Sequence, residues 1–500
     1  MVVAPEYSHV ATGYFVRVTL DDAPPLTRRA RRAAATSDVD DLEVFTTVTG
    51  ADPAPAAPGR DEPEAPTALA WVDPTALGPL RPVAYGSGDL LARRPRRAAL
   101  RPRVLIPIGS LLAVGGGYVV AALLWPLTAV APTVTAAEIA PVTAAASALT
   151  WPEAGSAAAG VDGIAQTAAS TTEASSMASI TKVVTVLMAL EQLPLEVGQT
   201  GQEFAFTYAD RVDYWNFRAR GESALDVPVD GTLTQYQLLQ GILMGSAGNY
   251  TERLAQELWP SDEVFANAAR TWLSAHGLDG ITVVEPTGIL EANAADPTTL
   301  LRLADLALAH PVVAEIVRTQ AVELPGAGDV ENTNDLLEDP SMRGVKTGGL
   351  WEWYNLLSAQ DITVGETPVR LYAAVLGQPT DALRDSESAR LLEQLAAEVS
   401  VPATLPAGTV AGTVSTAWGA TAEVVTDAAG SVVLWNGGTA EVEAQFTLDE
   451  ARTAGATVGT LTYAGPLDAD AIDLTLTDDI EPPSAWWRLS HPLELFGLAG

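Results

Sequence analysis

Met177-Ala178-Ser179-Ile180-Thr181-Lys182 leads into a largely apolar run at residues 183–190. The run predicts a buried helix that begins near Ser179. Residues three apart share a helix face, so the side chains of Ser179 and Lys182 should project together. A hydroxyl becomes a nucleophile when a neighbouring base accepts its proton, and a desolvated lysine one turn away is such a base. The stretch therefore predicts a Ser-x-x-Lys pair, although an isolated serine at a helix start more often only caps the helix.

Lysine is rare in this chain, which has two lysines among its 28 basic residues. An ammonium is compact and its pKa falls on burial until the neutral amine can act as a base, whereas a guanidinium stays charged. The second lysine lies in Arg343-Gly344-Val345-Lys346-Thr347-Gly348-Gly349. Lys-Thr-Gly accompanies Ser-x-x-Lys in the penicillin-recognising serine hydrolases. The two lysine motifs therefore support one another.

The order and spacing of these motifs resemble the low-molecular-mass D-alanyl-D-alanine carboxypeptidases, serine peptidases that trim cell-wall stem peptides and bind penicillin. The resemblance covers roughly residues 151–399, about half of the chain, and rests on MASITKVVTVLMALE, LLQGILMGSAGNYTERLA, EPTGILEAN, ENTNDLL and RGVKTGG followed by WYNLLSAQ. It implies an α/β (α+β) fold of the β-lactamase/DD-peptidase type. In that fold helices flank an antiparallel sheet, and a small all-β domain follows.

The resemblance also implies catalytic roles for three residues. Ser179 would attack the carbonyl of the penultimate D-alanine and form an acyl-enzyme, while Lys182 takes its proton. Ser246, in the middle motif, would relay a proton to the departing D-alanine nitrogen, because a leaving amine needs acid help. A capping box at Thr234 and Gln237 predicts a helix at residues 235–243, so Ser246 is expected on a loop between two helices.

Substrate binding is implied for the second lysine motif. Lys346 would supply a fixed cation for the terminal carboxylate of the substrate, with the hydroxyl of Thr347 beside it. Gly348 would leave room for the substrate along a strand. The backbone N–H groups of Ser179 and Gly349 would hold the oxyanion.

The middle motif departs from the family pattern Ser-x-Asn. This chain reads Ser246-Ala247-Gly248-Asn249, so glycine takes the third position and asparagine comes one residue late. Two outcomes follow: either turnover is reduced, or the loop rearranges and Asn249 contacts the substrate in place of the missing amide. Glu285, Asn332 and Asn334 match recurring family stretches and are interpreted as scaffolding.

Composition narrows the function classes. The net charge is −34, and because basic and acidic residues balance at 13 each up to residue 103, the rest of the chain carries the whole excess. Nucleic acid is therefore an unsuitable partner. The absence of cysteine excludes disulfides and a thiol nucleophile. Four scattered histidines form no metal-binding pair, so neither a metal nor a cofactor is expected.

One stretch, at residues 104–125, carries no charge over 22 residues and is long enough to cross a bilayer. Six arginines lie between residues 93 and 103, so the positive-inside rule places the N-terminus in the cytoplasm and the rest outside. An uncleaved single-pass anchor is favoured, although small residues at 144–146 leave cleavage open. The expected location is the cell membrane.

The chain is predicted to contain a mostly disordered tail (1–103), a transmembrane anchor (104–126), a linker (127–149), a catalytic domain (150–399), a small β domain (400–479) and an apolar tail (480–500). The apolar tail is expected to contact either the membrane or the protein's own surface. The favoured function is a membrane-anchored carboxypeptidase acting on stem peptides that end in D-Ala-D-Ala, with β-lactams as covalent inhibitors. A non-catalytic wall-binding scaffold is the alternative. A β-lactamase comes third, because no Glu-x-x-Leu-Asn-like segment is present to activate water.

Overall fold

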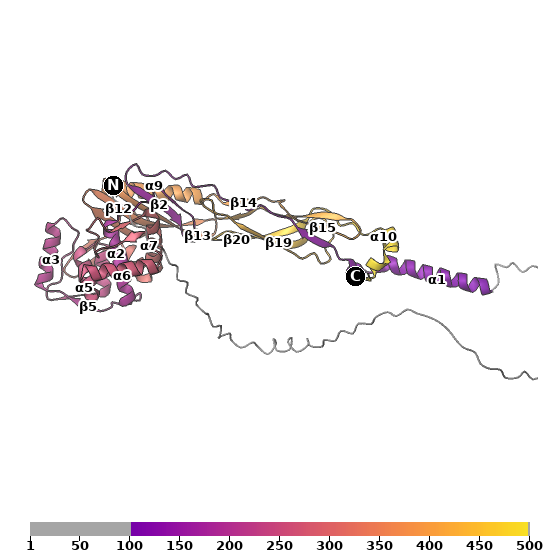
Figure 1. The fold of residues 1–500 in the computed structure, drawn as a ribbon, viewed down its shortest axis with the longest axis horizontal. Helices are drawn as coiled ribbons and strands as arrows, with labels where there is room; N and C mark the ends of the chain where they lie inside the picture. The colour runs from indigo at the N-terminus through magenta and orange to yellow at the C-terminus, as the bar shows by residue number, and fades with distance from the viewer. Residues whose placement is uncertain (1–101, 499–500) are drawn as a thin grey trace, which may run out of the picture. The chain divides into compact units, whose positions relative to one another are not determined.

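The computed structural model describes residues 102–498, so nearly all of the predicted cytoplasmic tail lies outside the described residues. Helix α1 (Pro102–Leu124) forms from the apolar stretch predicted as a membrane span (Figure 1). Its mean hydropathy is 2.0, and none of its most apolar window is buried against protein. At 1.5 Å per residue its 23 residues reach roughly 34 Å, which exceeds the ~30 Å hydrocarbon layer. By length and composition α1 is therefore able to cross a membrane.

A five-stranded antiparallel sheet forms the centre of the next region, in the order β11-β12-β13-β2-β3. Its strands are β2 (Ser156–Val161), β3 (Thr167–Ala169), β11 (Met342–Leu350), β12 (Trp353–Val364) and β13 (Thr367–Gln378). Strand β11 pairs only with β12 and so lies at one edge of the sheet. Strands β11, β12 and β13 are therefore neighbours both along the chain and in the sheet.

Helices cover both faces of this sheet (Figure 1). Ala373 and Val375 of β13 pack against α9 (Asp381–Val399) on one face. Ala374, between them in sequence, joins the larger core on the other face, formed mainly by α2 (Thr181–Gln192) and α7 (Pro297–Ala309). Alternate residues serve opposite faces because successive side chains of a strand point in opposite directions. Helices flanking an antiparallel sheet confirm the predicted fold class.

The remaining elements of this region build the rim of the sheet. The helices are α3 (Tyr208–Ala219), α4 (Gln235–Leu243), α5 (Gly248–Leu258), α6 (Asp262–Ala275) and α8 (Pro311–Val317). The short strands are β4 (Ser175–Ser176), β5 (Glu203–Ala205), β6 (Thr232–Thr234), β7 (Ile281–Thr282), β8 (Ala294–Ala295), β9 (Ala321–Leu324) and β10 (Gly328–Glu331). The predicted capping box is present, because the Thr234 side chain accepts from Gln237 N and the Gln237 side chain accepts from Thr234 N.

A second sheet of six strands lies mainly beyond residue 400, in the order β1-β15-β16-β20-β19-β18. Its strands are β1 (Thr133–Ala136), β15 (Val410–Ser415), β16 (Thr421–Thr426), β18 (Glu441–Phe446), β19 (Thr457–Ala464) and β20 (Ala469–Leu476), and β14 (Ala403–Leu405) pairs with β17 (Gly430–Val432). Alternate residues such as Leu461 and Tyr463 are buried in its core. The predicted small all-β domain is therefore present.

Strand β1 corrects the predicted linker at residues 127–149. Thr133 pairs with Ser415 and Ala136 with Gly412, so this segment extends the six-stranded sheet. The Thr-Val-Thr sequence suits a strand because β-branched side chains fit a pleated surface. The free backbone groups at the edge of β15 supply its hydrogen-bond partners.

The C-terminal segment packs against the end of α1. It forms the short helices α10 (Ala485–Ser490) and α11 (Pro492–Leu495). The Tyr118 hydroxyl donates to Leu489 O at 2.6 Å, and the Arg488 guanidinium donates to Trp125 O at 2.8 Å. The rings of Trp125 and Phe496 meet edge to face at 4.8 Å. Of the two predicted arrangements for the apolar tail, the structure therefore shows contact with the protein's own surface.

Candidate active site

Ser179 and Lys182 meet at the start of α2. A single 3₁₀ turn, η4 (Ala178–Ile180), carries the serine, and α2 begins at Thr181, two residues later than expected. The Lys182 Nζ donates to Ser179 Oγ at 2.8 Å and to Thr287 O at 2.5 Å. The predicted pairing of the two side chains is therefore present. Lys182 is only 2% exposed, which removes its amine from bulk water.

The surroundings of Lys182 lower the pKa of its amine. Burial lowers the pKa of Lys182 from its usual value to about 8, and the carboxylates of Glu285 and Glu222 oppose that fall. A pKa of about 8 leaves roughly a tenth of the amine unprotonated at pH 7, far more than the usual lysine pKa would leave. Lys182 is thus able to accept a proton from the hydroxyl that it contacts.

Glu285 holds the turn that faces Lys182. Its carboxylate accepts hydrogen bonds from the backbone N–H groups of Thr287 and Gly288, both at 2.7 Å, and from the side-chain amide of Asn293. These bonds fix the Thr287 carbonyl that accepts from Lys182. The turn also needs glycine, since Gly288 has φ +85° and a Cβ there would lie 2.0 Å from Ala178 O. The scaffolding role expected for Glu285 is present, together with an electrostatic effect on Lys182.

Lys346 lies on the edge strand β11 and is 1% exposed. Its Nζ donates to Thr347 Oγ1 at 3.2 Å, and among the residues that the structure describes no carboxylate forms an ion pair with it. Burial lowers the pKa of Lys346 well below its usual value, and the charges of Lys182 and Arg384 add to the effect. A bound carboxylate would supply the missing counter-charge.

The two glycines of the second motif differ in what surrounds them. A Cβ at Gly348 would lie 2.9 Å from Met177 O and 3.3 Å from Ala178 Cβ. Gly348 therefore makes room for the segment that carries Ser179. The room for substrate that the resemblance implies at Gly348 stays a prediction. Gly349 lines the cavity beside Ser179, and a Cβ there would meet no atom closer than 4.0 Å.

Ser246 lies in the tight turn between α4 and α5, as expected, and is almost fully buried. Its φ of +56° is unusual for a residue with a side chain. Gly248, two residues later, begins α5 and lines the cavity next to Ser179. The turn thus brings Gly248 to the cavity that holds Ser179, whereas Ser246 is not among the residues that line it.

The space beside Gly248 is already filled. A Cβ at this position would lie 2.6 Å from Phe217 Cε1 and 3.2 Å from Ser223 O, and the Gly248 N–H donates to Ser223 O at 2.8 Å. Residues 217–223, which end α3 and follow it, therefore occupy the region where an asparagine side chain would start. The obstacle is steric, because Gly248 does not use positive φ.

Asn249 turns away from this position. Its Oδ1 accepts from Leu225 N at 3.1 Å, and its Nδ2 donates to Leu225 O at 2.8 Å. Both polar atoms of the side chain are thereby committed to the backbone of residue 225. This geometry opposes the idea that Asn249 replaces the missing amide, and a role in substrate binding stays a prediction.

The cavity that holds Ser179 and Lys182 has a volume of about 140 Å³. Arg220 and Glu222 line it and form a bidentate ion pair at 2.7 and 2.9 Å. The sequence did not predict the ion pair between Arg220 and Glu222 at this cavity. Gly221 between the two charges marks a turn, but no local pattern indicates that the turn reaches Ser179, some forty residues away along the chain.

Several residues at or near the site have a strained backbone conformation with positive φ. Six non-glycine residues in the described part of the chain have positive φ, and three of them are Asp or Asn, which tolerate this region. The other three are Ala178, Ser246 and Trp351. Ala178 precedes Ser179, Ser246 belongs to the middle motif, and Trp351 lines the cavity. Strain of this kind persists where surrounding structure enforces it, and it is frequent at functional sites.

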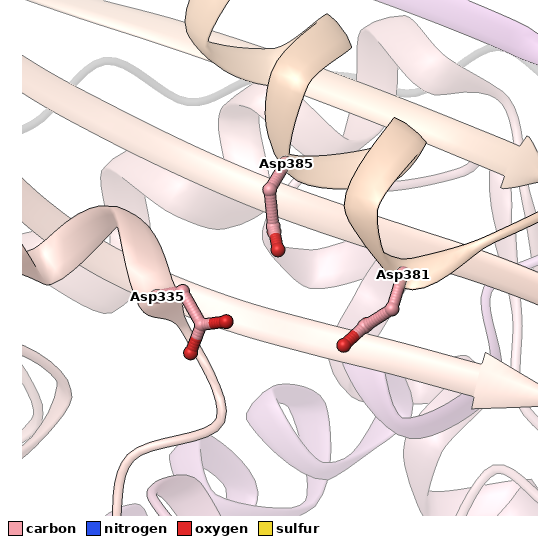
Figure 2. Close-up of side chains that lie close together, drawn as sticks. All are labelled: Asp335, Asp381 and Asp385. Atoms are coloured by element: carbon pink, nitrogen blue, oxygen red, sulfur yellow. The ribbon is translucent and has the colours of Figure 1, made fainter.

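One group of three carboxylates, Asp335, Asp381 and Asp385, lies close together within residues 102–498, and Figure 2 shows them converging from η5 (Asp335–Glu338) and α9. Arg384 forms ion pairs with both Asp381 and Asp385. Its buried guanidinium already compensates their charge, so these residues do not have the character of a cation site.

Comparisons with known proteins agree with the motifs. Residues 164–380 match the model of the D-alanyl-D-alanine carboxypeptidase family. The crystal structure of the Streptomyces K15 DD-transpeptidase is similar at 24% identity and a TM-score of 0.44, over 50% of this chain and 100% of that chain. The D-alanyl-D-alanine carboxypeptidase DacD from Francisella tularensis is similar at 16% identity and a TM-score of 0.44, over 67% of this chain and 95% of that chain.

A search of the curated proteins finds no match. The family match spans Ser179, Lys182, Ser246 and Lys346. Of these residues, Ser179 and Lys182 line the cavity, and Lys346 lies near enough to Lys182 for that charge to lower the pKa of Lys346. Over residues 164–380 this chain is therefore similar to the D-alanyl-D-alanine carboxypeptidases.

Proposed function

We propose that the protein removes the terminal D-alanine from peptidoglycan stem peptides through an acyl-enzyme on Ser179. The contact of 2.8 Å between Lys182 Nζ and Ser179 Oγ carries this proposal. Burial has prepared the amine as a base at the atom that must lose a proton, and the pKa of about 8 suits that task.

In the proposed acylation step, Ser179 Oγ attacks the carbonyl carbon between the two D-alanines and its proton passes to Lys182. The C–N bond then breaks, the departing D-alanine amine gains a proton and an ester remains on Ser179. Water hydrolyses this ester in the second step, which restores the hydroxyl. Ser246 is the proposed proton relay to the leaving amine.

Lys346 and Thr347 are the proposed receptor for the terminal carboxylate. Lys346 is buried without an ion-pair partner among the described residues, so an arriving anion gains a charge-assisted hydrogen bond in a site shielded from water. The carboxylate would also return the Lys346 amine to its protonated form. β-Lactams carry a carboxylate at a comparable distance from their reactive carbonyl and would use the same receptor.

A second candidate is a protein that is acylated by penicillin but turns over peptides slowly. The observation that favours it is the filled space beside Gly248, where Phe217 and Ser223 leave no room for an asparagine. In the family that asparagine orients the substrate amide, and removing one such hydrogen bond commonly costs about 10²–10³ in rate.

Two measurements separate these functions. The full-length protein is treated with a fluorescent penicillin, and release of D-alanine is measured with a peptide ending in D-Ala-D-Ala. Labelling with release supports the carboxypeptidase, labelling without release supports the slow variant, and neither supports a non-catalytic scaffold. Ser179→Ala must abolish labelling, whereas Ser274→Ala, on the exposed face of α6, must leave it unchanged. Labelling that persists in Ser179→Ala would remove Ser179 as the nucleophile.

We further propose that α1 anchors the protein with its N-terminus in the cytoplasm and the peptidase domain outside. The support is the cluster of arginines before the helix and its exposed apolar surface. Protease added to intact cells should digest the domain after α1 and spare residues 1–100. Protection of the peptidase domain would contradict this orientation and, with it, access to the cell wall.

A further inference from the structure

The segment at residues 217–223 forms part of the wall of the cavity that holds Ser179. The residues of this segment that line the cavity are Phe217, Arg220, Gly221, Glu222 and Ser223. The acylation step proposed above uses none of their side chains, although two of them are charged. The segment therefore brings two charges to the reacting serine that the proposed chemistry leaves without a role.

Gly248 holds this segment in place. A Cβ at Gly248 would lie 2.6 Å from the ring of Phe217, so the ring packs where only a glycine allows it. The Gly248 N–H also donates to Ser223 O at 2.8 Å, and the Glu222 N–H donates to Phe217 O at 3.0 Å. The glycine that stands in place of the family asparagine is thus the residue against which the charged segment is seated.

The ion pair of Arg220 and Glu222 leaves hydrogen-bond donors free beside Ser179. The Arg220 Nε and Nη2 donate to the Glu222 carboxylate at 2.7 and 2.9 Å. These bonds use two of the five N–H groups of a guanidinium. Among residues 102–498 no other hydrogen bond from this guanidinium is present, and half of the Arg220 side chain is exposed. The missing asparagine amide would also have supplied a donor at this cavity.

The guanidinium of Arg220 is fixed from two sides. Glu222 holds two of its nitrogen atoms, and the Phe217 ring lies under its face, 4.6 Å from Cζ to the ring centroid. A free arginine side chain loses much conformational entropy when it binds a ligand. In this arrangement part of that entropy is already lost before any ligand arrives, which strengthens binding.

The substrate of the proposed function needs a donor here. Its scissile carbonyl meets Ser179, and a second amide joins the penultimate D-alanine to the rest of the stem peptide. The carbonyl oxygen of that amide loses water when the peptide enters the cavity, and an acceptor left without a partner costs binding energy. The cations that line the cavity are Lys182 and Arg220, and Lys182 already contacts Ser179 and Thr287.

We propose that Arg220 takes the place of the missing asparagine amide and donates a hydrogen bond to the carbonyl oxygen of the amide that precedes the scissile bond. Glu222 is a positioning residue, because it acts by holding the guanidinium. The proposal rests on the proposed function, from which it takes the position of the scissile carbonyl at Ser179. The asparagine lost from one segment is thereby compensated from another.

Two β-lactams that differ in one group test this contact. Benzylpenicillin carries an acylamino group, whereas penicillanic acid has the same bicyclic ring and carboxylate without it. Intact-protein mass spectrometry gives the second-order rate constant with which each acylates Ser179. Arg220→Met should lower the ratio of the two constants about tenfold, the lower range for a hydrogen bond to a charged group. An unchanged ratio would overturn the proposal.

The ratio separates a substrate contact from an effect on the fold. A displaced segment, or a changed pKa of Lys182, slows both reagents alike and leaves the ratio as it was. Arg220→Lys keeps a cationic donor and should recover part of the ratio that Arg220→Met loses. A ratio as low in Arg220→Lys as in Arg220→Met, together with equally slower acylation by penicillanic acid, would assign Arg220 to the structure of the segment and overturn the proposal.

Arg253 provides a matched control. It pairs with Glu257 at 3.0 Å and lies over the Phe204 ring at 5.2 Å, so it resembles Arg220 in both contacts, but it does not line the cavity. Arg253→Met should leave the ratio unchanged. A fall in the ratio equal to that of Arg220→Met would show that the loss of any such arginine has this effect, which contradicts a contact specific to Arg220.

The positioning role of Glu222 has its own variant. Glu222→Gln keeps an acceptor but holds the guanidinium less firmly, so the ratio should fall roughly two- to threefold, as expected for a partly exposed ion pair. A ratio equal to that of the unaltered protein would remove Glu222 from the proposal.

Binding to the Ser179→Ala variant separates a failed contact from a failed enzyme. This variant forms no acyl-enzyme, so binding is measured by NMR titration without turnover. The ligands are N-acetyl-D-Ala-D-Ala and propanoyl-D-alanine, which lacks only the acetylamino group. Adding Arg220→Met should weaken binding of the first ligand about tenfold and leave the second unchanged. That result supports the contact even if the unaltered protein releases no D-alanine. Equal weakening of both, or no binding of either, overturns it while penicillin labelling still reports on Ser179.

Discussion

Lys182 and Lys346 are equally buried, yet their surroundings differ. Lys182 sits on a helix, contacts a hydroxyl and a carbonyl, and has Glu285 and Glu222 near enough to stabilise its charge. Lys346 sits on an edge strand, contacts only the hydroxyl of its neighbour Thr347, and has two other cations nearby.

The different surroundings explain why two buried lysines are proposed to have different roles, one as a base and one as a receptor for an anion. Burial lowers the pKa of both amines, because a low-dielectric interior disfavours the ammonium. Around Lys182, carboxylates limit the fall, so the pKa stays near neutrality, where a base is useful. Around Lys346, no carboxylate among the described residues does so, and in the proposed function the anion comes from the substrate.

Replacing each lysine in turn tests most directly whether the two side chains have different roles. Lys182→Met should reduce acylation at saturating substrate by about 10²–10⁴, the usual contribution of a general base. Lys346→Met should instead raise KM by roughly 10- to 100-fold, since a hydrogen bond to a charged group contributes about 1.5–3 kcal/mol. Rapid-quench acylation with penicillin and steady-state peptide kinetics measure the two effects. Equal acylation defects at saturation in both variants would contradict the division of roles.

A larger side chain at Gly248, which lines the same cavity as Lys182, should strongly affect stability and turnover. Gly248→Asn places a Cβ against the Phe217 ring, and overpacking of this kind costs about 1–3 kcal/mol. We expect lower thermal stability and no gain in turnover. Gly248→Asn combined with Phe217→Ala makes room for the amide and should turn over faster than Phe217→Ala alone. A rise in turnover from Gly248→Asn alone would show that the loop moves aside and that the missing amide was the main defect.

Asn249→Ala should lower the stability of the protein without changing the proposed roles of Lys182 and Lys346. It removes both hydrogen bonds to Leu225, and leaving buried backbone groups unpaired costs about 1–3 kcal/mol. The unfolding free energy should fall by that amount while kcat of the folded protein stays within about twofold. Denaturant titration and D-alanine release are the two measurements. A large loss of kcat with unchanged stability would instead place Asn249 at the substrate.

The smallest effect concerns pH. Because the neutral amine of Lys182 is the proposed base, acylation should rise with pH and reach half its maximum near pH 8. The Glu222 carboxylate raises the pKa of Lys182, so Glu222→Gln should lower that pKa and move the midpoint to lower pH. Glu263→Gln, in the first turn of α6, is the control. A midpoint that moves upward in Glu222→Gln would have the wrong sign for a lysine base.

Much of the site was predictable because its parts are local in sequence. Ser179 and Lys182 are three residues apart, so helical geometry alone brings them together, and Lys346 to Gly349 lie on one strand. The helix expected at residues 235–243 has those bounds, since the side chain of Thr234 caps it.

The rest depends on segments that meet only in the folded chain. No pattern in residues 217–223 indicates that Phe217 fills the space beside Gly248, or that Glu222 lies near Lys182. The sequence predicted a linker where β1 lies, because a four-residue edge strand is too short to show a clear apolar alternation. Strand β1 is paired with β15. The contact of α10 with α1 joins residues 371 apart in sequence.

The amino-acid sequence by itself determined the chemical groups of the site and their order along the chain, because spacing within one helix or one strand sets which side chains share a face. The fold determines how far burial lowers the pKa of each lysine, how closely Gly348 approaches the segment that carries Ser179, and how the space at Gly248 is filled. These features arise from burial and from distances between remote segments. Neither quantity exists until the chain has folded.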